Sequence, residues 1–310
     1  MNNFQGKKVD PDSYVYTTFI MCGQEYVPGA LTLAESLRVV DPDIERYLIY
    51  TEDVDVSELR ESFICIKVPY LSIKCKPLPT HRMRRNYGSW IDKSFTKLNI
   101  FNPNIWPLGF NKKIIYIDAD QTCVGDMSHL SLLDTPAIGY GSQFIQGNPA
   151  NLYSLKHGDR VNPWEIGRWM NNLQVVCASG VMVLYPNAPI FQHVLRLMKP
   201  NFGYNLRNGY EEQILLKTFV DLQINSFHID GRYYHNLYDI SNVVCINYFG
   251  HKKPWHESNT IYPDTFIFNH FFLLSYLRRH HKELYDTLPD MIKRPKIKYE
   301  DEGRNSDELN

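Results

Sequence analysis

The sequence predicts an α/β fold with a mixed, mostly parallel central sheet flanked by helices. Apolar runs typical of buried strands alternate with helical periodicity along roughly the first 70 residues, and this rhythm indicates right-handed strand–helix–strand units. A length of 310 residues suits one large α/β domain. A hydrophobic content of 44%, with 14% aromatic residues, indicates a well-filled core.

The elements follow from these patterns in chain order. The run YVYTTFIMC at residues 14–22 predicts a buried strand, and residues 26–40 place alanine and leucine side chains on one helical face. Further strands are expected at 46–51, 63–68, 113–117, 136–140 and 180–185, and further helices from 57 and at 83–99, 189–198, 211–219 and 277–288. Residues 141–174 are polar and rich in Gly, Asn and Pro, which predicts a long functional loop or lid.

The domain prediction is simple, because the sequence contains no internal repeat and no clear linker. We expect an N-terminal extension at residues 1–13, a single domain at 14–292 and a charged, disordered tail at 293–310.

Charge, hydrophobicity and cysteine content limit the classes of binding partner and the cellular location that we expect. A formal net charge of -1 gives no general attraction for nucleic acids or membrane surfaces. No run of about eighteen apolar residues is available to span a bilayer, and the amino terminus lacks the apolar segment of a signal peptide. The six cysteines show no paired zinc spacing, so we expect buried, reduced thiols in a cytoplasmic protein. A homodimer is left open.

The most informative segment is Asp118-Ala119-Asp120, which ends the apolar run at 113–117. If the strand continued, its period of two would turn both carboxylates to the same side. Two such carboxylates suit a hard divalent ion such as Mn²⁺ or Mg²⁺. The alternative is a solvated turn in which both aspartates act as local caps.

Several separated segments together resemble glycosyltransferase family eight, the group of glycogenin and galactinol synthase, whose nucleotide-sugar fold is the Rossmann-like GT-A fold. The segments are residues 26–31 (YVPGAL) with 34–38 (AESLR), 95–98 (FTKL), 115–120 (IYIDAD), 179–183 (SGVMV), 212–215 (EQIL) and 250–255 (GHKKPW). Residues 87–90 (YGSW), leading into 94–97 (SFTK), look closest to glycogenin-like proteins of some large DNA viruses.

The resemblance implies a donor site for a UDP-sugar. Asp118 and Asp120 would hold Mn²⁺, or Mg²⁺, against the diphosphate, with Asp118 near the ribose, and Gly250 and Lys253 would close over it. The remaining nucleotide contacts would be Ile20, Cys22, Tyr26 and Ala119. Tyr26 would stack on the uracil or pack in the core, and Lys253 could instead be a solvated loop lysine.

The resemblance also implies catalytic residues. Glu212 and Gln213 match an Asp-Gln pair beside the anomeric face of the donor sugar in these retaining enzymes. Lys97 would reach the donor sugar or phosphate from its helix, or remain a surface lysine. Glu211 is more simply an acid that favours the amino end of a helix.

Three departures from the family pattern matter. Asn247 stands where the family has a histidine as third metal ligand, with His251 and His256 as nearby substitutes. Ala178 replaces a sugar-binding asparagine. The segment that carries the self-glucosylated tyrosine in glycogenin looks truncated around Tyr238, so we expect transfer to a separate acceptor of unknown nature.

The sequence therefore predicts a Mn²⁺-dependent retaining transferase that uses UDP-glucose or UDP-galactose. One alternative is a weak or inactive UDP-sugar-binding protein, motivated by Asn247 and Ala178. A sugar nucleotidyltransferase is another, although residues 22–24 (CGQ) make a poor glycine-rich loop. The metal hypothesis also predicts that Asp120→Asn abolishes metal-dependent UDP binding while leaving the thermal unfolding midpoint nearly unchanged.

Overall fold

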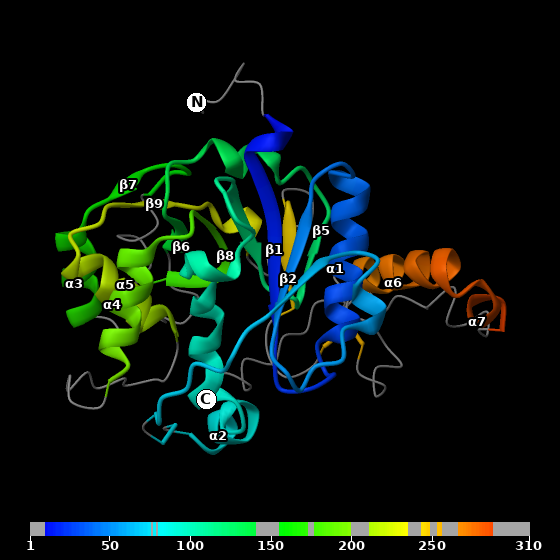
Figure 1. Cartoon of the computed structure of the whole chain (residues 1–310), viewed down its shortest axis with the longest axis horizontal. Helices are drawn as coiled ribbons and strands as arrows, with labels where there is room; N and C mark the ends of the chain where they lie inside the picture. The colour runs from blue at the N-terminus through cyan, green and yellow to red at the C-terminus, as the bar shows by residue number, and fades with distance from the viewer. Residues whose placement is uncertain are drawn as a thin grey trace, which may run out of the picture.

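A computed structural model of the chain describes residues 10–75, 77–78, 80–140, 155–172, 177–199, 211–234, 243–248, 253–255 and 266–287. An eight-stranded sheet forms the centre of the molecule, with helices on both of its faces (Figure 1). This architecture confirms the predicted α/β class.

The sheet has the strand order β3-β2-β1-β4-β8-β6-β9-β7. Its strands are β1 (Tyr14–Ile20), β2 (Arg46–Tyr50), β3 (Ile64–Lys67), β4 (Lys113–Ile117), β6 (Ala137–Tyr140), β7 (Arg160–Val161), β8 (Cys177–Leu184) and β9 (Ser226–His228). The first half, β3 to β4, is parallel, whereas β8 runs antiparallel to both of its neighbours. A separate antiparallel pair joins β5 (Gln121–Cys123) to β10 (Cys245–Asn247).

The helices are α1 (Val27–Val40), α2 (His81–Tyr87), α3 (Pro163–Asn172), α4 (Ala188–Leu197), α5 (Glu211–Asp221), α6 (Phe266–His280) and α7 (Lys282–Thr287). Short 3-10 helices are η1 (Pro11–Ser13), η2 (Ser57–Leu59), η4 (Pro103–Ile105), η5 (Ser128–Leu132) and η8 (Gly231–Tyr233), and a longer one, η3, spans Ile91–Phe101. Helices α1 and α6 lie on one side of the sheet, and α3, α4 and α5 lie on the other (Figure 1).

Strand β4 shows why both faces of the sheet are covered. Ile114 and Tyr116 pack into the cluster formed with η3, α4 and α5, whereas Ile115 and Ile117 pack into the cluster formed with α1. A strand that carries apolar side chains on both of its faces must bury both faces, which is typical of a strand at the centre of a sheet. The strand is thereby held firmly up to the point where Asp118 begins.

Three sequence-based boundaries are wrong. The helix expected at 83–99 is interrupted after α2, where the N–H of Gly88 donates to the carbonyl of Arg84, because a glycine disfavours continuation of the helix. The segment 141–174 is not one long loop, since it contains β7 and α3. The closing helix begins earlier than expected, as α6, and is divided from α7 near residue 281.

In the described residues, no helix is both long and apolar enough to cross a membrane. The six cysteines are free, as expected, but Cys22 is exposed rather than buried. The N-terminal extension and the tail at 293–310 lie mostly outside the described residues, so their predicted character is not tested.

Candidate functional site

The candidate site begins where β4 ends. Asp118 directly follows this strand, and its N–H donates to the carbonyl of Gly180 in β8 over 2.8 Å. Ala119 is buried against α1, where a side chain at Gly29 would lie 2.5 Å from the Ala119 carbonyl oxygen. Since β1, β2 and β4 are parallel, their carboxyl ends share the edge of the sheet at which α/β proteins place ligands.

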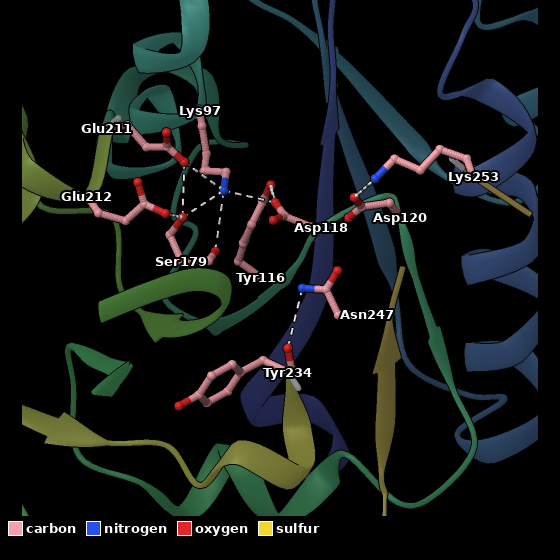
Figure 2. Close-up of polar contacts among 10 residues, drawn as sticks. All are labelled: Lys97, Tyr116, Asp118, Asp120, Ser179, Glu211, Glu212, Tyr234, Asn247 and Lys253. Carbon is pink, nitrogen blue, oxygen red and sulfur yellow. Dashed lines mark hydrogen bonds and ion pairs between the residues drawn. The ribbon is translucent and has the colours of Figure 1, made fainter. Parts of the chain in front are cut away.

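Lys97 joins two parts of the chain at this edge (Figure 2). Its ammonium nitrogen lies 2.9 Å from Oδ1 of Asp118 and 2.9 Å from Oε1 of Glu211. It also donates to Oγ of Ser179 over 3.0 Å. The residue is only 7% exposed, so the surface interpretation of Lys97 is wrong. Burial alone lowers the pKa of this lysine, but Asp118 and Glu211 outweigh it and hold the pKa well above its usual value.

Tyr116 also contacts the carboxylate of Asp118. Its hydroxyl donates to Oδ1 of Asp118 over 2.5 Å, and the Lys97 ammonium lies 5.0 Å from the centre of its ring. Burial and the charge of Asp118 raise the pKa of Tyr116 well above its ordinary value, so the hydroxyl remains a donor. Asp118 is therefore oriented by a cation and a hydroxyl together.

Two adjacent acids at the first turn of α5 have different surroundings. Glu211 pairs with Lys97, whereas Glu212 accepts a hydrogen bond from Oγ of Ser179 over 2.8 Å. The Ser179 hydroxyl also lies 3.0 Å from Oε1 of Glu211. Burial, followed by the charge of Glu211, raises the pKa of Glu212 to about 7. Glu211 is therefore an acid at the amino end of a helix, as expected, and also the ionic partner of Lys97.

Asp120 meets a different lysine. The ammonium of Lys253 lies 2.6 Å from Oδ2 of Asp120 and donates to the Tyr248 carbonyl over 2.7 Å. Lys253 is only 3% exposed, so it is not a solvated loop lysine. Because β4 stops at Ile117, the two aspartates do not share one strand face. Each carboxylate instead engages its own cation (Figure 2).

Asn247 lies beside both aspartates, at the end of β10 and directly across from Gln121 in β5. Its amide nitrogen donates to the Tyr234 carbonyl over 3.3 Å, and Figure 2 shows the amide oxygen on the opposite side, toward Asp118 and Asp120. The amide is thus oriented to present an oxygen.

The absence of a side chain at Gly180 lets Gln121, Asn247 and Asp118 come close to the backbone of β8. A Cβ on Gly180 would lie 2.5 Å from Nε2 of Gln121, 3.3 Å from Nδ2 of Asn247 and 3.5 Å from Oδ2 of Asp118. An all-oxygen set of two carboxylates and one amide is the chemistry that Mg²⁺ and Mn²⁺ prefer. The residues present therefore fit a divalent ion. In the described part of the chain, no three His, Cys, Asp or Glu side chains form a group that could hold a metal ion, so this set depends on the amide of Asn247.

The expected nucleotide contacts lie near the ends of β1 and α1. Ile20 is buried, and Cys22 has a positive φ of 62° with its N–H donating to the hydroxyl of Tyr70 over 3.1 Å. Tyr26 is half-buried with its ring edge-on to Trp255, and the Lys253 ammonium lies 5.6 Å from its centre. This placement is compatible with either role considered for Tyr26.

The other predicted residues divide into two groups. Gln213 is half-buried in the first turn of α5, and Ala178 is half-buried in β8. Gly250, His251, His256 and Tyr238 lie outside the described residues.

The motifs did not assign a role to Tyr116, Glu211 or Gln121. Tyr116 lies two residues before Asp118 on the same strand, and its spacing could have suggested a contact. Glu211 could have been found only by asking which of two adjacent acids faces Lys97. The position of Gln121 depends on the pairing of β5 with β10, which the sequence does not reveal.

No protein-family model matches the chain. It is 23% identical over 264 residues to the uncharacterized protein R707 of Acanthamoeba polyphaga mimivirus, covering 80% of this chain and 84% of that protein. It is 22% identical over 246 residues to a protein of Arabidopsis thaliana provisionally named UDP-glucuronate:xylan alpha-glucuronosyltransferase 4, covering 77% of this chain and 36% of that protein. Glycogenin of Komagataella phaffii is 23% identical over 194 residues, which cover 61% of this chain and 40% of glycogenin. The chain thus matches well under half the length of the two named relatives.

Solved structures share the fold. The apo glycosyltransferase GlyE of Streptococcus pneumoniae TIGR4 matches with a TM-score of 0.52 and 15% identity, over 88% of this chain and 64% of GlyE. The galactosyltransferase LgtC, solved with donor and acceptor sugar analogues, matches with a TM-score of 0.51 and 14% identity, over 90% of this chain and 99% of LgtC. The fold comparisons therefore confirm the expected GT-A fold, and the sequence comparisons confirm the expected resemblance to glycogenin and related glycosyltransferases.

Proposed function

We propose that the protein transfers a hexose from a UDP-sugar to a separate acceptor, with a divalent metal ion and with retention of anomeric configuration. The observation that carries this proposal is the pairing of Asp118 with Lys97 and of Asp120 with Lys253 at the carboxyl end of β4. Carboxylates for a metal and lysines for phosphate oxygens thus lie together, as the departure of a nucleoside diphosphate requires.

Asp118, Asp120 and Asn247 are the proposed metal-binding residues, with Mn²⁺ first and Mg²⁺ as the substitute. The bound ion would neutralise charge that develops on the leaving diphosphate. Lys253 lies within reach of the same charge, since its ammonium contacts Asp120. When a diphosphate enters, this lysine can exchange a carboxylate for a phosphate oxygen.

The donor sugar is proposed to lie against Lys97, Glu212 and Gln213. Lys97 and Glu212 both contact the Ser179 hydroxyl, so Lys97, Glu212 and Ser179 form one continuous polar surface. Such a polar surface can orient a sugar and stabilise an oxocarbenium-like centre. The proposed uracil contacts are Ile20, Cys22, Tyr26 and Ala119, and Gly250 is proposed to approach the diphosphate.

Glucose and galactose are the proposed sugars. Two related proteins support a sugar-nucleotide donor: one is named as a UDP-glucuronate-dependent transferase, and the other is a galactosyltransferase solved with donor and acceptor sugar analogues. UDP-glucuronate therefore belongs among the donors to be tested. A cytoplasmic location is also proposed, supported by the six free cysteines.

The test is release of UDP from UDP-glucose, UDP-galactose and UDP-glucuronate, with Mn²⁺, Mg²⁺ or EDTA, in the presence of a panel of sugar, glycan and protein acceptors. We expect metal-dependent release with at least one donor and an unchanged mass of the enzyme itself. The anomeric configuration of the product, measured by NMR, tests retention. Formation of a nucleotide-sugar from UTP and a sugar phosphate would contradict the proposal.

A catalytically inactive UDP-sugar-binding protein is the second candidate. It is favoured by Asn247, because a neutral amide is a weaker partner for Mn²⁺ than a charged or imidazole ligand. Saturable, metal-dependent binding of UDP-sugars with neither hydrolysis nor transfer would support this candidate over the first.

A further inference from the structure

The two adjacent acids of α5 are not equivalent toward Lys97. The lysine ammonium lies 2.9 Å from Glu211 and 2.9 Å from Asp118, so both of its ion pairs go to other carboxylates. Among the ion pairs of the described residues, Glu212 has none. Glu212 is therefore the carboxyl group of this cluster that lacks a cation.

The hydroxyl of Ser179 cannot serve both acids at once. It lies 2.8 Å from Oε1 of Glu212 and 3.0 Å from Oε1 of Glu211, yet it carries a single hydrogen. Lys97 already donates to the Ser179 oxygen and to Glu211. Because Glu211 already accepts from Lys97, placing the Ser179 hydrogen on Glu212, at the shorter distance, leaves each of the two acids with a donor.

The second oxygen of Glu212 remains without a partner. Oε2 is buried and accepts no hydrogen bond from the described residues. A buried carboxylate oxygen without a donor is costly in its ionised form, whereas a protonated oxygen there is a donor that can meet a ligand. Geometry alone thus favours a neutral Glu212 with its proton on Oε2.

The charged and titratable groups around Glu212 come from three elements. Glu211 precedes it on α5 and disfavours its ionisation, Lys97 of η3 partly compensates, and the buried thiol of Cys177 lies on β8. Burial, with Glu211 next, raises the pKa of Glu212 to about 7, in agreement with the hydrogen-bond count. The acid is therefore set to change its protonation near neutral pH.

We propose that Glu212 binds the donor as a neutral carboxylic acid and donates a hydrogen bond from Oε2 to an oxygen of the donor hexose, and that Glu211 is the positioning residue that keeps it neutral. This inference rests on the proposed donor site. Glu211 does so by holding Lys97 away from Glu212 and by placing a negative charge beside it. The ligand chemistry is a hydroxyl or ring oxygen of a sugar.

The test compares UDP with non-transferable 2-fluoro analogues of UDP-glucose and UDP-galactose, at saturating Mn²⁺, between pH 5.5 and 8.5. The hexose contribution is the affinity for the UDP-sugar analogue divided by the affinity for UDP. In the wild-type protein this ratio should fall about tenfold as pH rises through about 7, because Glu212 loses the hydrogen that it donates to the sugar. Glu212→Gln keeps a neutral hydrogen-bond donor at this position, so the hexose contribution to affinity in this variant should be independent of pH. Glu211→Gln should lower the midpoint by about one pH unit, because Glu212 loses a neighbouring negative charge and Lys97 is freed to approach it, and an unchanged or raised midpoint would contradict the role of Glu211.

A control variant is Glu283→Gln, which removes an exposed acid from the first turn of α7 and should reproduce the wild-type profile. Thermal unfolding of each variant establishes that it is folded. If Glu212→Gln loses the hexose contribution at every pH, or if the wild-type contribution grows as pH rises, the inference is wrong.

A second measurement needs no ligand and separates this inference from the proposed function. The infrared difference between wild type and Glu212→Gln at pH 6 should contain the carbonyl band of a protonated carboxylic acid. Its absence overturns the neutral-acid inference even when UDP-sugars bind. Its presence, together with a failure of every UDP-sugar to bind, would retain the neutral acid as a property of the protein but overturn both its role toward a hexose and the proposed function.

Discussion

The ammonium of Lys253 lies 2.6 Å from Oδ2 of Asp120, although the two residues are 133 positions apart in the chain. Lys253 is held there by a second bond, to the carbonyl of Tyr248, whose own N–H donates to the Asp120 carbonyl. A protein cation thus already faces a carboxylate that we propose as a metal ligand. Metal binding at Asp120 and release of Lys253 toward a diphosphate would then be coupled events.

Removing this lysine should separate the two events. In Lys253→Met, Mn²⁺ binding without nucleotide should tighten about tenfold, because a competing cation is lost. UDP binding at saturating Mn²⁺ should weaken about tenfold, because a phosphate partner is lost. Mn²⁺ binding is measured by electron paramagnetic resonance and UDP binding by calorimetry. Lys112→Met, at the other end of β4, is the control and should change neither affinity. Unchanged Mn²⁺ affinity in Lys253→Met would exclude competition at Asp120.

Asp120→Asn should abolish metal-dependent UDP binding. The sequence suggested that the unfolding midpoint would hardly change, but Asp120 is the ionic partner of a buried lysine. We therefore expect a loss of about 1–3 kcal/mol in the free energy of unfolding, since Lys253 would keep a buried charge without its carboxylate. Urea unfolding measures this loss. Adding Lys253→Met to Asp120→Asn should restore stability without restoring metal binding, and a restored metal affinity would argue against Asp120 as a ligand.

Replacing Asn247 with histidine tests the third ligand position. Asn247→His should strengthen Mn²⁺ binding about tenfold above pH 7 and weaken it below about pH 6, where the imidazole takes up a proton. Asn247→Ala should weaken binding at all pH values. Calorimetry at several pH values measures both effects. Equal Mn²⁺ affinity in the wild type and both variants would place the metal away from β10.

Gly180→Ala tests the room beside the aspartates. The added methyl group would lie 2.5 Å from Nε2 of Gln121, so this amide must shift, and it would also crowd Asn247 and Asp118 at 3.3 Å and 3.5 Å. We expect metal-dependent UDP binding to fall at least about tenfold with a destabilisation of about 1–3 kcal/mol. The matched control is Gly167→Ala in α3, where the nearest atoms are methyl groups of Val220 at 3.7 Å and 3.8 Å. That variant should bind normally and be slightly more stable, as alanine is the better helix former. Normal UDP affinity in Gly180→Ala would show that the site tolerates a side chain there.

The stability of the protein should depend on pH through Glu212. Its pKa is raised to about 7 in the folded protein, so the folded state binds more protons than the unfolded chain between about pH 4.5 and 7. The free energy of unfolding should therefore decrease as pH rises through this window. Relative to Glu212→Gln, the wild type should lose on the order of 1–3 kcal/mol between pH 5 and pH 8. Urea unfolding of both proteins at the two pH values gives the difference, and a parallel decline in both would assign the effect to other groups.

The sequence alone determined the parts of the site that depend on local patterns. The apolar run at 113–117 and the two aspartates after it predicted both the strand and the place where it ends, because a buried strand has a readable period and a polar stop. The same reasoning located most strands and helices. It failed at Gly88, where a glycine that disfavours helix was not taken as a boundary, and within 141–174, where short elements depend on packing against distant parts of the chain.

The tertiary structure decided which charges meet. Lys97 on η3 and Glu211 on α5 come together only because both elements pack on the same face of the sheet, next to Ser179 in β8. Which of two adjacent acids faces Lys97 follows from the rotation of α5 about its axis, and a one-residue difference in the sequence carries no such information. Sequence reasoning could therefore name Glu212 and Lys97, but it could not see that Glu211 holds the lysine and leaves Glu212 without a cation.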